Sequence, residues 1–169
     1  MANLIPISTV VVGSGGAANI EFTSIPATYT DLLLKISTRS TYAANFSRAK
    51  LQINSSTTGY TSILVYGQNT TTSSASSTDY ITYFYSTGSS STANTFANTE
   101  IYLPNYASAN AKSTSSDSVT ENNAAEAFLA LSAGLQTSTA AISSLTITDA
   151  NAGNLTIYSS ATLYGIRKY

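Results

Sequence analysis

Short runs in which apolar and polar residues alternate recur along this 169-residue chain, and Ser, Thr, Gly and Asn separate them. A period of two places successive side chains on opposite faces of a strand, so it indicates half-buried β-strands. In residues 18–25, for example, Ala18, Ile20 and Phe22 fall on one face and polar residues on the other. The chain is therefore expected to be all-β.

The spacing of these runs predicts roughly ten strands with turn signals between them. The expected strands are residues 5–12, 18–25, 31–38, 50–53, 60–66, 79–86, 96–103, 112–120, 141–148 and 155–166. The first two flank a glycine-rich turn and are expected to form a hairpin. The pattern is typical of one antiparallel β-sandwich domain over residues 1–169, jelly-roll-like in its connections, with the termini close together.

Four segments are less regular. Residues 67–78 and 87–93 are almost entirely polar and are expected to be exposed loops. Residues 112–120 are rich in Ser, Thr and Val, which is compatible with an edge strand. Residues 124–135 place apolar residues at both helical and alternating spacing, and in an otherwise β chain we expect a strand there.

The composition argues against most chemistry. His, Cys and Trp are absent, and the chain carries only seven basic and eight acidic residues. Ordinary zinc sites and disulfides are thereby excluded, and no basic stripe suits nucleic acid. No apolar run approaches the ~20 residues of a membrane helix, and the start lacks the features of a signal peptide. We expect no enzyme activity, no cofactor, no metal, and neither nucleic acid nor membrane as a partner.

Two acidic groupings are the strongest candidates for chemistry. Folding could bring Glu100 and Asp117 together, as a glycosidase requires, although both alternate with polar neighbours as surface residues do. Asp149, Asn151 and Asn154 have the spacing of the start of a calcium loop, but no acidic residue closes it. A turn in which Asp and Asn bond their own backbone is the favoured interpretation there.

The aromatic run at residues 79–86 offers a candidate contact surface. Tyr80, Tyr83 and Tyr85 could form a platform for sugars or for another protein, or they could fill the edge of the core.

The N-terminal segment is a second candidate contact surface. Pro6 interrupts the first strand there, so residues 1–7 are expected to form an arm in which Asn3, Leu4 and Ile5 contact a partner.

Several strings spread over most of the chain resemble a group of small virion proteins of tailed bacteriophages. The strings are residues 25–34 (IPATYTDLLL), 100–106 (EIYLPNY), 115–124 (SSDSVTENNA) and 161–166 (ATLYGI). They specify a family and no active site, so no binding residues carry over.

The resemblance implies a phage structural protein, and we favour a capsid decoration (cement) protein. Such proteins are small and often trimeric, and they carry no chemistry. The implied partner is the major capsid protein, and the implied location is the capsid surface of the virion, after synthesis in the host cytoplasm. The alternative is a tail-fibre or tail-tip component that binds host glycans. A decoration protein should present one apolar contact face, whereas a glycan-binding module should present a groove lined by the three tyrosines.

Overall fold

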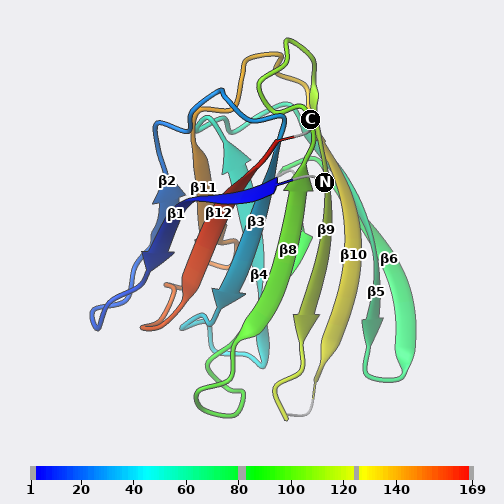
Figure 1. Cartoon of the computed structure of the whole chain (residues 1–169). Coiled ribbons are helices and arrows are strands. Elements are labelled where there is room, and N and C mark those ends of the chain that lie inside the picture. Colours follow the sequence, from blue (N-terminus) through cyan, green and yellow to red (C-terminus); the bar gives the residue numbers. More distant parts are fainter. Residues whose placement is uncertain (1–2, 80–82, 124–125, 168–169) are drawn as a thin grey trace.

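The computed structural model describes residues 3–79, 83–123 and 126–167, and in these ranges it is all-β, with twelve antiparallel strands and no helix (Figure 1). The strands form two sheets. The large sheet contains, in spatial order, β1 (Asn3–Val11), β12 (Ser160–Arg167), β3 (Asp31–Thr38), β8 (Ala97–Leu103), β9 (Lys112–Thr120), β10 (Phe128–Gln136), β5 (Tyr60–Gln68) and β6 (Thr71–Ser77). The small sheet contains β2 (Asn19–Phe22), β11 (Leu145–Asp149), β4 (Phe46–Ile53) and β7 (Tyr83–Thr87).

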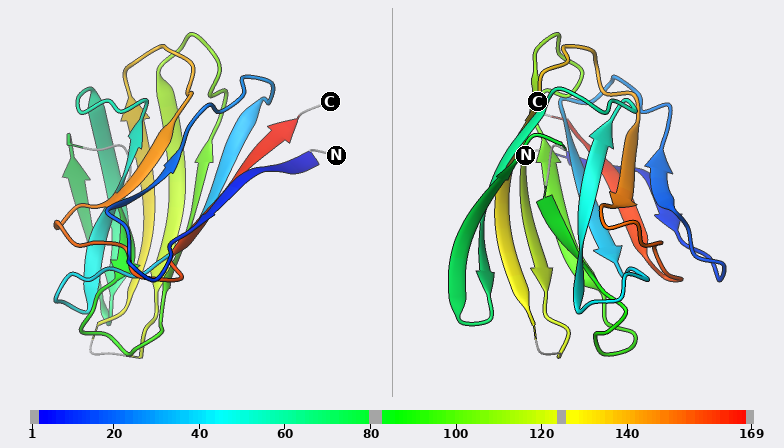
Figure 2. Two further views of the ribbon diagram at one scale, coloured as in Figure 1. Left: turned by 90° about the vertical axis from the view of Figure 1, so that its left-hand side faces the viewer. Right: turned by 180° about the vertical axis from the view of Figure 1, so that it is seen from behind.

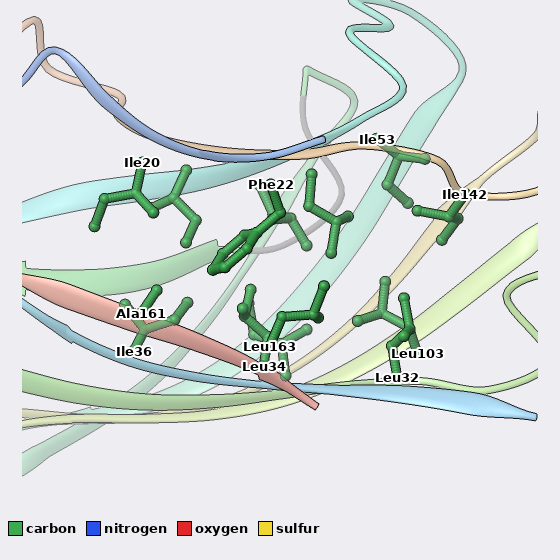
Figure 3. Close-up of a cluster of buried hydrophobic side chains, with 14 of the residues drawn as sticks. Ile20, Phe22, Leu32, Leu34, Ile36, Ile53, Leu103, Ile142, Ala161 and Leu163 are labelled. Atoms are coloured by element: carbon green, nitrogen blue, oxygen red, sulfur yellow. The ribbon is translucent and has the colours of Figure 1, made fainter. Parts of the chain in front are cut away.

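The two sheets pack face to face, which confirms the predicted β-sandwich. The predicted alternation explains the packing: Leu32, Leu34 and Ile36 all point inward from β3 and are buried. In Figure 3 the side chains of Ile20 and Phe22 from the small sheet point toward this row. Burying each aliphatic side chain contributes about 1.5–3 kcal/mol, so this layer is the main source of stability. The jelly-roll connectivity stays a prediction.

The predicted N-terminal hairpin is wrong. β1 pairs with β12 in the large sheet, whereas β2 pairs with β11 in the small one. The glycine-rich turn therefore carries the chain from one sheet to the other. The alternation of apolar and polar residues is the same in a hairpin and in such a crossing, so the sequence pattern alone does not distinguish them. Because Asn3 lies opposite Arg167, the two ends of the described chain are adjacent, as expected.

Two predictions about polar segments also need correction. Residues 67–78 are not a loop, because β5 continues to Gln68 and β6 follows after a tight turn in which Asn69 has a φ of 52°. Residues 112–120 are not an edge strand, because β9 lies between β8 and β10. Its inward hydroxyls pair across the sheet instead of packing against apolar groups: Ser118 bonds Thr99 at 2.8 Å, and Ser116 bonds Ser132 at 2.7 Å.

β5 and β6 extend sideways beyond the small sheet (Figure 2, right). β7 reaches β9, β10 and β5, and four aromatic rings, from β4, β5, β7 and β10, close the sandwich there. The rings belong to Phe46, Tyr66, Tyr85 and Phe128. β6 lies outside this cluster, and its residues 71–76 are exposed on both faces.

Two cations hold loops through backbone carbonyls. The buried Lys112 ammonium donates to the carbonyls of Ser108 at 2.7 Å and Asn110. Burial lowers the pKa of this lysine. Arg39 directly follows β3 and forms a β-bridge with Thr87. Its guanidinium donates to carbonyls along the segment between β7 and β8, those of Ser89, Ser91, Thr92 and Thr95.

Arg39→Ala is expected to lower the free energy of unfolding by about 1.5–3 kcal/mol, since several carbonyls lose a charged donor at once. Urea denaturation followed by circular dichroism measures the loss. Arg167→Ala is the control, because Arg167 covers the ring of Tyr29, 5.4 Å from its centroid, and its loss should cost about 1 kcal/mol or less. Equal losses in the two variants would contradict the role of Arg39.

Because of Tyr60, we expect the protein to lose stability at alkaline pH. Its buried hydroxyl accepts the Ile53 N–H at 3.0 Å and donates to the Ser56 carbonyl at 3.0 Å, and burial raises its pKa. Above about pH 10 the phenol ionises in the unfolded chain but stays protonated in the folded one, so stability falls as pH rises, by up to about 1.4 kcal/mol per pH unit. Urea denaturation from pH 8 to 11 should show a shallower fall in Tyr60→Phe. Parallel curves for the two proteins would refute this effect.

Candidate functional site

The most unusual surface of the molecule is an apolar patch on the outer face of the large sheet, the side turned away from the core. We call it the outer apolar face, and it consists of Ile63, Val65, Val119, Leu129, Leu131 and Leu135. Ile63, Leu129 and Leu131 are 57–60% exposed, and Val65 is 54% exposed. Single exposed aliphatic side chains are ordinary, but a contiguous group marks an interaction site.

The strand register makes the group contiguous. Leu131 on β10 lies opposite Val65 on β5, and Leu129 lies opposite Val119 on β9. Ile63 lies opposite Ala133, and together with Val65 and Leu131 it lines a shallow hollow. Cross-strand neighbours of this kind have Cβ atoms about 4.5–5.5 Å apart, so the side chains touch and form one surface.

Polar groups border the outer apolar face on both sides. Toward β6 the neighbours are hydroxyls, such as Ser74 opposite Val65. Toward β3 the border is charged: Lys35 Nζ lies 3.0 Å from Glu100, and Asp117 follows on β9. The hydrogen bond and charge of Glu100 raise the pKa of Lys35. An apolar centre with a polar rim is the composition of a protein-contact surface.

The structure brings Glu100 and Asp117 together, directly opposite each other on β8 and β9. The arrangement does not suit a glycosidase, because both carboxylates project from the same side of one open sheet instead of facing each other across a cleft. Glu100 is also held by Lys35. This pair therefore forms part of a solvated charged border.

The Asp149 segment forms the expected turn. The backbone N–H of Asn151 donates to Asp149 Oδ1 at 2.7 Å, which is the local bond that Asp makes in turns. Within the described residues no group of three or more acidic side chains could hold a metal ion. Nor does any helix in the described ranges have the length and apolar character needed to cross a bilayer.

The structure places some of the predicted contact residues at the surface and buries another. Asn3, Leu4 and Ile5 lie in β1, paired with β12, so the structure shows an edge strand where a free arm was expected. Leu4 is 47% exposed and can still contact a partner. The prediction for Tyr85 is wrong, because its ring is buried and stacks on Phe128 at 4.5 Å.

For Tyr80 and Tyr83 the predicted contact role stays a prediction. The backbone of Tyr83 pairs with Lys50 at the start of β7, and Tyr80 lies outside the described residues. No residue of the outer apolar face was among the predicted contacts. A signal was nevertheless present, because residues 124–135 are apolar on both alternating faces and only one face of a strand can meet the core.

Comparisons with known proteins do not identify the chain. No protein-family model matches it, and no curated protein matches it. Among solved structures it is similar to a fructofuranosidase from Schwanniomyces occidentalis in complex with fructosylnystose, at 9% identity and a TM-score of 0.22. The match covers 98% of this chain and 33% of that one, so the chain spans a third of that protein's length. A likeness this weak carries no argument.

Proposed function

We propose that the protein is a non-enzymatic virion structural protein of a tailed phage that decorates the outer surface of the assembled head. The observation that carries this proposal is the outer apolar face with its polar rim. A stable monomer gains nothing from exposing these side chains to water, whereas an adhesive protein needs them. The partner is the major capsid protein, and the complex lies on the capsid surface.

Binding of this kind stabilises a shell by mass action. A ligand that binds the assembled capsid but not the free subunits favours the assembled state by RT ln(1 + [L]/Kd) at each site. An uncharged apolar contact also loses little strength in salt, because screening acts on charges. This suits a surface whose centre is built from uncharged side chains and whose border carries the Lys35–Glu100 ion pair.

The copy number of the protein in purified virions tests the proposal. Quantitative mass spectrometry against the major capsid protein should give comparable amounts of the two. A few copies per particle would favour the tail component that binds host glycans, and absence from the virion would refute a structural role. The tail alternative has lost part of its support, because the buried ring of Tyr85 cannot line a sugar groove.

A further inference from the structure

The two sheets have four edge strands, and three of them are protected against pairing with another chain. β1 carries Pro6 and a register shift between Pro6 and Ser8. β2 is only four residues long and carries the exposed Glu21. β7 is held from the side, since the Tyr85 N–H donates to Ser118 Oγ at 3.0 Å. Proline, bulges, charges, short length and cover are the usual devices that prevent edge-to-edge association.

β6 has none of these devices. Its seven residues include no charge and no proline, and its pairing with β5 has no register shift. Within the described residues no strand pairs with its other side. Alternate residues of an edge strand direct N–H and C=O groups outward, so β6 presents an uninterrupted row of hydrogen-bonding groups to solvent.

We propose that β6 pairs antiparallel with β6 of a second copy, so that two large sheets join into one continuous sheet across a two-fold axis at Ser74. Full overlap of residues 71–77 places Ser74 opposite the partner's Ser74 and Thr72 opposite the partner's Ser76. A two-fold axis brings like residues together, and a charged strand would therefore repel itself near the axis. The uncharged Ser and Thr residues of β6 avoid this and can pair their hydroxyls across the strands.

The pairing has a consequence for the outer apolar face. Because the axis is perpendicular to the sheet, both copies of the face lie on the same side of the joined sheet. The two β5 strands are then three strand spacings apart, about 14 Å. A dimer would present two apolar faces to one surface and bind with greater avidity than a monomer. The pairing itself does not depend on the proposed function, and it replaces the trimer implied by the resemblance with a dimer.

Single cysteines test the register, because the chain has no cysteine of its own. In Ser74→Cys the two thiols lie opposite each other at the axis, with Cα atoms about 5.5 Å apart, within the range of a disulfide. Mild oxidation of the full chain should give a covalent dimer. Thr72→Cys is the matched control on the same strand and face. Its two Cα atoms would be four residues apart along the strands, about 13 Å, which is too far for a disulfide.

Sedimentation of the unmodified protein over a range of concentrations tests the association itself, and a dimer is expected. Ser74→Lys should weaken dimerisation by at least about tenfold, because like charges would face each other. Ser8→Lys on the protected edge should leave it unchanged. A monomer at all concentrations, a trimer, or equal cross-linking through positions 72 and 74 would overturn the proposal. These readouts need no phage head, so they can fail or succeed separately from the proposed function.

Discussion

The double variant Val65→Glu, Leu131→Lys is expected to bind assembled heads at least about 30-fold more weakly than the wild type, because interface hot spots contribute 2 kcal/mol or more. The two residues lie opposite each other at the centre of the outer apolar face. Burying an ion pair at a contact costs desolvation that apolar side chains do not. Cosedimentation with heads that lack the protein measures the change.

This variant is designed to keep the fold. Both side chains are more than half exposed, so neither change opens a cavity in the core. The new Glu and Lys face each other, and position 131 also faces Asp117, so the new lysine meets only acidic neighbours across the strands. The net charge of the chain does not change. An unaltered circular dichroism spectrum and urea midpoint should accompany the loss of binding.

The matched control is Thr9→Lys, Thr162→Glu, in which the new glutamate faces Lys35 across the strands, just as the new lysine at position 131 faces Asp117. Thr9 and Thr162 also lie opposite each other on the large sheet, and their hydroxyls are 3.0 Å apart. The control adds the same pair of charges far from the outer apolar face and should leave binding unchanged. Equal binding by both double variants would show that this face does not contact the head.

Inward-facing apolar residues made the fold predictable from the sequence. β3 was recognised because Leu32, Leu34 and Ile36 alternate with other residues, and β10 because the surrounding chain is β. β6 was missed because both of its faces are exposed, so no apolar alternation marks it. β9 was misplaced at an edge because hydroxyl pairs such as Ser116 with Ser132 fill its inward side.

The candidate site was less predictable than the fold. An exposed Leu131 and a buried Leu34 look alike in a sequence, and only the pairing of strands tells which apolar face meets the core. The same difficulty applies to Tyr85. A run of aromatic residues indicates either a binding platform or a core edge, and the ring turned out to pack inside the sandwich.

Phe128→Ala is expected to lower the free energy of unfolding by about 3–5 kcal/mol, the largest loss of stability among our predictions. The Phe128 ring is buried and meets three others, with centroids 4.2 Å from Phe46, 4.5 Å from Tyr85 and 6.0 Å from Tyr66. Truncation leaves a cavity at the point where β7 and β4 hold β10 and β5. Urea denaturation measures the loss, and hydrogen exchange should show β5 and β6 opening first.

Two further variants test whether the loss of stability comes from the missing ring of Phe128 or whether any substitution in β10 lowers stability. Phe128→Leu keeps most of the volume and should recover at least half of the loss, because the cavity is smaller. Leu129→Ala changes the neighbouring residue on the outer face, where Leu129 is 57% exposed, and should cost less than about 1 kcal/mol. A Phe128→Ala loss no larger than that of Leu129→Ala would mean that the aromatic cluster does not hold the two sheets together. In that case the outer apolar face would be supported by strand pairing alone, and head binding should survive the loss of the ring.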